Sequence, residues 1–122
     1  MPGLFGRRSG PEPQENLDPG DRRLIEYLRS HGANLELPRE TRHWIYFSSR
    51  EAAETAARRL AQAGYSVDVA PSPQKTGNEW RVLATGMDVV KPATFAQVRQ
   101  FMEELASRGE GEYDGWEASI KP

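Results

Sequence analysis

Apolar and polar side chains alternate most clearly in the stretch 42–47, whose sequence is Arg-His-Trp-Ile-Tyr-Phe. Aromatic and β-branched residues at this density favour a pleated, half-buried strand. Because successive side chains of a strand point to opposite faces, Ile45 and Phe47 share one face, and Trp44 and Tyr46 share the other. Large rings therefore occur on both faces. The pattern predicts a strand inside a sheet that uses both of its faces.

Three other stretches carry apolar residues at the three- and four-residue spacing of an amphipathic helix: residues 18–31, 50–63 and 94–108. The first has a narrow stripe, formed by Leu24, Ile25 and Leu28. The stripe of the second is almost entirely alanine, so this helix should lie close against its neighbours. The third is the strongest prediction because six apolar side chains share one stripe: Phe95, Val98, Phe101, Met102, Leu105 and Ala106.

Residues suited to helix capping stand at the start of each predicted helix. Asp18 precedes Pro19, and proline is favoured at the first helical position. Two pairs have the spacing of a capping box at the start of the other helices: Ser48 with Glu51, and Thr94 with Gln97. Glycines at positions 32, 64 and 109 are expected to end the three helices.

Three further stretches have strand character: residues 65–70, 80–85 and 113–120. In the last of them, Gly115 predicts a bulge or a close approach of another backbone. The order from residue 41 onward is then β-α-β-β-α-β, the split βαβ pattern. We predict an α+β protein, a ferredoxin-like βαββαβ sandwich with an extra N-terminal helix. Its first and third strands are expected to be central and parallel, with both helices of the sandwich on one face.

The length of 122 residues suits one domain. Residues 1–17 hold several glycines and prolines and are predicted to be a flexible tail. Residues 18–40 hold the first helix and a connector with little regular structure. Residues 41–122 hold the ferredoxin-like domain.

Two helices on one face leave the other face of the sheet open. Four side chains are expected on that open face: Trp44, Tyr46, Arg81 and Leu83. We predict that they bind a partner. Two alternatives stand beside this prediction: the N-terminal helix covers Trp44, or the rings stack on the bases of single-stranded RNA. A third is that the sheet binds a small ligand or a second copy of the chain.

Composition argues against several kinds of chemistry. The chain has no cysteine, which removes thiolate nucleophiles and cysteine-ligated metals and fits a reducing, cytoplasmic location. The chain has no run of about 18 apolar residues, so the sequence does not predict a membrane span. The net charge of −2 does not favour a large nucleic-acid footprint, which needs clustered positive charge. No phosphate-binding, dinucleotide-binding or zinc-protease motif occurs, so we predict no cofactor.

The chain has two histidines. His31 falls near the end of the first helix, where the helix dipole favours a partly positive ring. His43 falls on the same side of its strand as Ile45, and we interpret it as a half-buried, hydrogen-bonded residue rather than a catalytic one. The alternating acidic residues at positions 110, 112 and 114 indicate a solvated turn rather than a metal site. The sequence therefore predicts a protein without enzymatic activity.

The segment 111–118 resembles the closing motif of the regulator of ribonuclease E activity B family. The residues that carry this resemblance are Glu112, Tyr113, Asp114, Gly115 and Trp116. Shorter similarities lie at residues 32–35, 38–40, 43–47 and 83–85, so the resemblance extends over about residues 21–120. Members of that family are inhibitors of ribonuclease E with a ferredoxin-like fold. The resemblance implies a non-enzymatic protein that binds a ribonuclease and alters its cleavage of RNA.

Taken together, these features predict a regulator that acts by protein–protein contact. The first candidate partner is ribonuclease E or a related enzyme of RNA decay. The alternative is a single-stranded RNA-binding module that uses the open face of the sheet.

Overall fold

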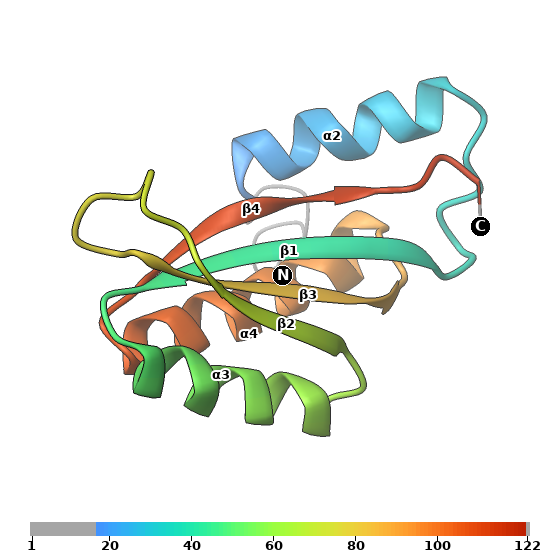
Figure 1. The fold of residues 1–122 in the computed structure, drawn as a ribbon. Helices are drawn as coiled ribbons and strands as arrows, with labels where there is room; N and C mark the ends of the chain where they lie inside the picture. Colours follow the sequence, from blue (N-terminus) through green and yellow to red (C-terminus); the bar gives the residue numbers. More distant parts are fainter. Residues whose placement is uncertain (1–16, 122) are drawn as a thin grey trace, which may run out of the picture.

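The computed structural model describes residues 17–121. Residues 1–16, which make up nearly all of the predicted tail, lie outside this described part. The elements, in chain order, are α2 (Pro19–Ser30), β1 (Arg39–Phe47), α3 (Arg50–Gln62), β2 (Ser66–Pro71), β3 (Trp80–Asp88), α4 (Pro92–Arg108) and β4 (Glu112–Ala118) (Figure 1). This order confirms the predicted α+β class with an additional N-terminal helix. None of the described helices is long and apolar enough to cross a membrane.

The four strands form one sheet in the order β2-β3-β1-β4. β1 and β3 are central, as predicted, but they run antiparallel, and so do the other two neighbouring pairs. The expectation of parallel central strands was wrong. α3 returns the chain so that β2 runs in the same direction as β1, and the β2–β3 hairpin then reverses the direction. β3, which lies between them, must therefore oppose β1.

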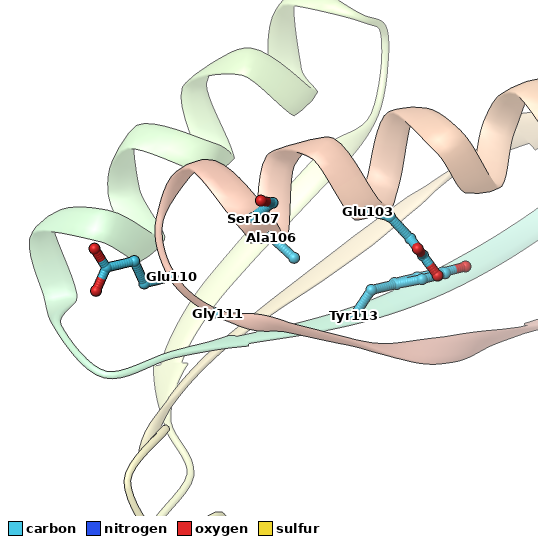
Figure 2. Close-up of a pocket in the computed structure, with 6 residues that line it drawn as sticks. All are labelled: Glu103, Ala106, Ser107, Glu110, Gly111 and Tyr113. Atoms are coloured by element: carbon cyan, nitrogen blue, oxygen red, sulfur yellow. The ribbon is translucent and has the colours of Figure 1, made fainter.

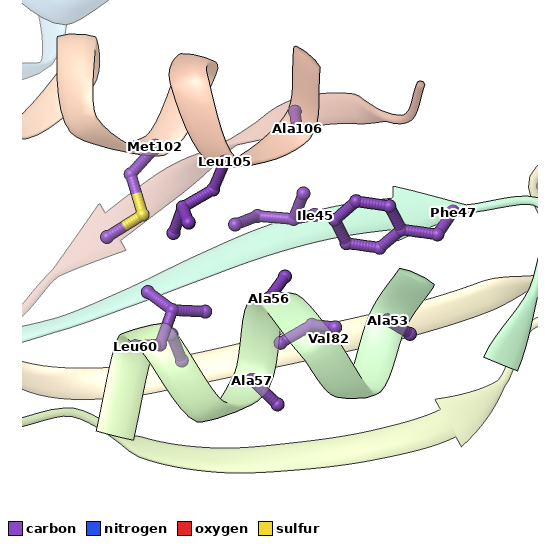
Figure 3. Close-up of a cluster of buried hydrophobic side chains, with 11 residues drawn as sticks. Ile45, Phe47, Ala53, Ala56, Ala57, Leu60, Val82, Met102, Leu105 and Ala106 are labelled. Carbon is purple, nitrogen blue, oxygen red and sulfur yellow. The ribbon is translucent and has the colours of Figure 1, made fainter. Parts of the chain in front are cut away.

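α3 and α4 cover the same face of the sheet, and the main core lies between them and the central strands (Figure 3). Strands β1 and β3 contribute Ile45, Phe47, Val82 and Ala84 to this core. α3 contributes Ala53, Ala56, Ala57 and Leu60, whereas α4 contributes Met102, Leu105 and Ala106. The alanine face of α3 is buried, as the sequence predicted, because small side chains allow a helix to approach its neighbours closely.

A second apolar cluster docks α2 on the rest of the molecule. It joins Ile25 and Leu28 of α2 to Phe95 of α4, and Trp116 of β4 packs against it. The prediction that Leu17 belongs to a flexible tail is wrong, because its side chain is buried in this apolar cluster. α2 thus lies along α4 and the edge strand β4, on the helical side of the sheet. It does not cover Trp44, which stays outside both clusters.

β1 is longer than expected because it begins at Arg39, inside the predicted connector. Arg39 is fully buried. Its guanidinium donates hydrogen bonds to three carbonyl oxygens, those of Asn34, Ser119 and Ile120, at 2.5–2.9 Å. A buried cation can be tolerated where backbone acceptors surround it. β3 likewise continues to Asp88, beyond the predicted end at residue 85.

The helix starts differ in part from the capping predictions. Asp18 caps α2 as expected, because its side chain accepts hydrogen bonds from the backbone N–H groups of Gly20 and Asp21. α3 is capped by Ser49 rather than Ser48, through a 3.1 Å hydrogen bond from the N–H of Ala52. α4 begins earlier than predicted, with Lys91 as its N-cap and Pro92 as its first residue, so Thr94 and Gln97 do not form a capping box there. At the start of α3, Ser48 and Ser49 are adjacent and either could serve as the N-cap. At the start of α4, proline at the first helical position needs no side-chain cap.

Candidate partner-binding face

The four predicted partner-binding residues lie together on the face of the sheet opposite α3 and α4. They form two directly opposed pairs across the central strands, Trp44 with Leu83 and Tyr46 with Arg81. Trp44 and Leu83 are partly exposed. Met87 projects from the same face near the end of β3 and is 61% exposed. The centre of the open face is therefore an apolar surface that reaches solvent.

Tyr46 is only 9% exposed, although it lies on the open face. Lys75, from the loop between β2 and β3, covers it. The Lys75 ammonium lies 4.9 Å from the centre of the Tyr46 ring and 3.0 Å from an Asp114 carboxylate oxygen. The hydrogen bond and the charge of Asp114 raise the pKa of Lys75. The loop therefore closes one end of the open face by a cation–π contact and an ion pair.

The open face carries more acidic than basic side chains. By strand register and contact, its carboxylates are those of Glu40, Asp68, Glu112, Asp114 and Glu117, and its cations are those of Arg42, Lys75 and Arg81. Each of the three cations already pairs with a carboxylate of this face: Arg42 with Glu40 and Glu117, Lys75 with Asp114, and Arg81 with Asp68. The face thus combines an apolar centre with a rim of net charge −2.

A bulge in β4 sets the direction of the side chains in the closing motif, residues 112–116. Trp44 pairs with Gly115 and Ile45 pairs with Tyr113, so Asp114 is an extra residue in β4. Gly115 has φ +123°, a conformation that strongly favours glycine. This confirms the predicted bulge.

The consequence of the bulge is that Tyr113 and Trp116 point to the same side of the sheet. In a regular strand, residues three positions apart point to opposite faces. The extra residue restores Tyr113 to the helical side, where it pairs with Ile45 and lies near Trp116. Asp114 instead meets Lys75 above the open face.

Both inward-pointing residues of the motif make buried polar contacts. The Tyr113 hydroxyl lies 2.9 Å from Nδ1 of His43. The Trp116 indole N–H donates a 2.8 Å hydrogen bond to a carboxylate oxygen of Asp21, and its ring lies 4.1 Å from the ring of Phe95. Glu112 is exposed and makes no such contact. The motif is therefore chiefly a structural device that fastens β4 to β1, α4 and α2.

His43 is fully buried and belongs to a network around Asp88. Its Nε2 lies 3.1 Å from Oδ2 of Asp88. Thr41 and Tyr65 donate further hydrogen bonds to the same carboxylate, at 2.5 and 2.8 Å. With the proton on Nε2, the ring of His43 donates to Asp88 and accepts from the Tyr113 hydroxyl, so both ring nitrogens are satisfied.

These contacts shift the pKa values of the network. Burial by itself raises the pKa of Asp88, but the hydrogen bonds from His43, Thr41 and Tyr65 outweigh burial and lower it. Burial, together with the Asp88 charge, raises the pKa of Tyr65. Burial also raises the pKa of Tyr113, against a smaller opposing effect of Arg99. Both tyrosines therefore remain protonated hydrogen-bond donors at neutral pH.

Arg99 of α4 extends the polar contacts to α2. Its guanidinium lies 4.9 Å from the centre of the Tyr113 ring. It also holds both oxygens of the buried Asp21 carboxylate, at 2.6 and 3.0 Å. The hydrogen bonds and charge of Asp21 raise the pKa of Arg99 despite burial. Hydrogen bonds, together with the cation–π contact between Arg99 and Tyr113, thus connect Asp21 to Asp88.

A pocket of about 520 Å³ opens beside this network, between the end of α4 and the start of β4 (Figure 2). It is lined by Glu103, Ala106, Ser107, Glu110, Gly111 and Tyr113. In Figure 2 the Glu103 carboxylate lies beside the Tyr113 ring, while Glu110 lies at the far end of the pocket. Glu103 is already bonded to Arg99 at 2.6 Å, and His43 has no exposed surface. The pocket therefore does not bring an accessible acid–base pair to a substrate.

Sequence reasoning placed His43 correctly as a satisfied residue, but it is fully buried rather than half-buried. It did not predict that Asp88 is a hydrogen-bond partner of His43, or that Tyr65 and Arg99 belong to the same network. One feature of the sequence indicated that His43 needs such partners. A histidine that alternates with Ile45 and Phe47 faces the core, and both of its nitrogens then need partners. The pattern alone did not say which residues supply them.

The described residues form a small α+β protein whose four-stranded antiparallel sheet is covered by α3 and α4 on one face. The family model for regulator of ribonuclease activity B matches residues 20–118, from the first turn of α2 to the last residue of β4. The chain belongs to this family, which confirms the resemblance of its closing motif. The family consists of regulators of ribonuclease activity rather than enzymes. No curated protein matches the chain.

Proposed function

We propose that this protein modulates ribonuclease E, or a related enzyme of RNA decay, by direct protein–protein contact through the open face of its sheet. Membership of the family supports the regulatory role. The observation that carries the choice of surface is the partly exposed Trp44–Leu83 pair at the centre of an acidic face. Both proteins would then act in the cytoplasm.

Trp44 is the natural anchor of this contact. Tryptophan is among the residues that most often dominate the energy of an interface. The residue of β4 that pairs with Trp44 is Gly115, where an added Cβ atom would meet no atom within 4 Å. Side chains of a partner therefore have room to approach the indole from the β4 side. Leu83 and Met87 extend the apolar centre, and Arg81 lies at its margin.

The acidic rim favours a partner with a basic surface. Opposite charges across an interface increase the rate of association and help to exclude wrong partners. RNA is the less suitable ligand because each open-face cation is already paired and the net charge of the face is negative. Tyr46, the second ring that would stack on a base, is covered by Lys75.

The proposal includes regulation without catalysis by this chain. His43 is sealed in the core, and the two tyrosines bonded within its network are held protonated by burial. A hydrolytic or transfer activity that His43→Ala abolishes in a folded protein would contradict this part of the proposal.

The test compares Trp44→Ala with Tyr27→Ala, a matched aromatic truncation on α2, where Tyr27 is 51% exposed. Binding to purified ribonuclease E and its RNA cleavage rate are measured for each variant. We expect Trp44→Ala to weaken binding about tenfold or more and to reduce the effect on cleavage, whereas Tyr27→Ala leaves both unchanged. Equal effects of the two variants would reject the open face as the contact.

A parallel titration with labelled single-stranded RNA at two salt concentrations decides the alternative. Binding to bases and phosphates would be lost in Trp44→Ala and would fall steeply as salt rises. That result would replace the protein partner by RNA.

A further inference from the structure

A narrow groove lies between α3 and α4, on the helical side of the molecule. Its volume is about 240 Å³, and its surface is mostly apolar. Ala52 and Ala56 of α3 line one side, and Leu105 and Gly109 line the other. Thr55, Arg59 and Arg108 complete the lining, and the two arginines bring two positive charges to it.

The groove exists because small side chains face each other across the two helices. Gly109 has no room for a side chain, since an added Cβ would lie 2.6 Å from the Phe47 ring and 3.3 Å from the Cβ of Ala52. The floor is therefore closely packed against the buried Phe47. This floor, with alanine on one side and Leu105 and Gly109 on the other, forms the hollow.

The two arginines of the groove, Arg59 and Arg108, form no ion pair within residues 17–121, and the same holds for Arg23, Arg39 and Arg58. Five other arginines each form one: Arg29, Arg42, Arg50, Arg81 and Arg99. Arg59 and Arg108 are both exposed. They occupy the last turns of their helices, where the helix dipole favours a cation. The helix dipole therefore explains why arginines occur at the ends of these helices. It does not explain why an apolar hollow lies beside them.

We propose that this groove binds an acidic segment of a protein partner, with one apolar side chain in the hollow and flanking carboxylates on Arg59 and Arg108. The groove is smaller than pockets for drug-sized ligands, which span about 300–1,000 Å³. Its volume therefore suits a single aliphatic or aromatic side chain rather than a larger ligand. Guanidinium groups suit carboxylates because they donate two parallel hydrogen bonds. The groove and the open face then select segments of opposite charge, and the groove proposal does not depend on the open-face proposal.

A nucleic acid fits this groove less well. Proteins that bind single strands combine a track of cations with exposed aromatic rings on which bases stack. The groove offers alanine and leucine instead of rings. The charge and the apolar floor therefore favour an acidic peptide.

The probe is a fluorescent peptide with the sequence Glu-Asp-Leu-Phe-Asp-Glu, together with a peptide in which serine replaces both apolar residues. Three charge reversals of the full chain are compared: Arg59→Glu, Arg108→Glu and the control Arg23→Glu, which makes the same charge change on the exposed surface of α2. We expect each groove variant to weaken binding of the first peptide about tenfold or more, and the control to change it less than about twofold. The serine peptide should bind about tenfold more weakly to the unaltered chain.

Amide chemical shifts on the isotope-labelled chain locate the peptide. We expect changes at Ala52, Thr55 and Gly109, and unaltered binding in Trp44→Ala, which separates this proposal from that for the open face. The proposal is overturned if the peptide does not bind, if Arg23→Glu weakens it as much as the groove variants, or if both peptides bind equally. It is also overturned if labelled RNA displaces the peptide from the groove. Self-association that Arg59→Glu abolishes would identify a second copy as the occupant and equally overturn it.

Discussion

The indole N–H of Trp116 donates a hydrogen bond to the carboxylate of Asp21, so β4, the last strand of the sheet, is bonded directly to α2. Asp21 is 2% exposed, and Arg99 binds its two oxygens from α4. Three elements far apart in the chain thus meet at one buried carboxylate. The segment that matches the family begins in α2 and ends in β4, so elements at both of its ends meet at this carboxylate.

Replacing Asp21 by alanine should therefore destabilise the whole domain. The change leaves the Arg99 guanidinium, which is 20% exposed, and the Trp116 N–H without their acceptor. Breaking a buried ion pair costs about 3–5 kcal/mol, and we expect about 3 kcal/mol in urea unfolding because Arg99 retains Glu103. The control is Glu26→Ala, which breaks the exposed pair with Arg29 and should cost less than about 1 kcal/mol. Similar losses would show that the Asp21 contact is not a major source of stability.

Leu28→Ala tests the apolar part of the same docking. Leu28 is 1% exposed and packs in the cluster that joins α2 to Phe95. Truncation of a buried leucine costs about 2–5 kcal/mol, and we expect at least 2 kcal/mol by denaturant unfolding. Tyr27→Ala, at an exposed position of the same helix, should cost much less. A negligible effect of Leu28→Ala would mean that α2 is not docked in solution.

The bulge in β4 predicts a large difference between Gly115→Ala and Asp114→Ala. Gly115 has φ +123°, a conformation that alanine adopts only with backbone strain, although an added Cβ would meet no atom within 4 Å. We expect Gly115→Ala to cost about 1–3 kcal/mol, because the bulge that keeps Tyr113 and Trp116 on the same side of the sheet needs this conformation. Asp114→Ala keeps the bulge and removes only the ion pair with Lys75, which should cost less than about 1 kcal/mol. Unfolding curves of the two variants measure the difference, and comparable values would argue against the role of the bulge.

Asp88 predicts how stability depends on acid. Its pKa in the folded protein lies below the usual value of 3.8, so the folded state favours the carboxylate. The resulting stability is fully present above about pH 4, and is lost as the pH falls through the lowered pKa of the folded state. We expect the urea midpoint of the unaltered chain to fall with acid over this range. Asp88→Asn should be less stable at neutral pH but should lose less stability on acidification. Identical slopes in both proteins would contradict the linkage.

Local patterns were sufficient to predict which elements form and, in β1 and α4, the faces of their side chains. Alternation in β1 placed Ile45 and Phe47 toward the core and Trp44 toward the open face, because the direction of a strand side chain depends only on its parity. The same reasoning placed the six apolar residues of α4 on one buried or partly buried stripe. The extent of β1 was missed because Arg39 reads as a surface residue in sequence, and only the three carbonyl groups around it make its burial possible.

What the sequence by itself determined is the order of the elements, the α+β class and the glycine at which β4 departs from regular geometry. Only the tertiary structure decided that β1 and β3 run antiparallel, that α2 docks beside β4 and that Tyr113 turns inward to meet His43. The physical reason is the separation along the chain over which each kind of interaction acts. Periodicity and capping act over a few neighbouring residues, whereas the partners of Asp21 and Asp88 come from strands and helices up to 95 positions away. Which residues form such pairs depends on how the helices and strands pack against one another. The pattern of residues within any one segment does not specify that packing.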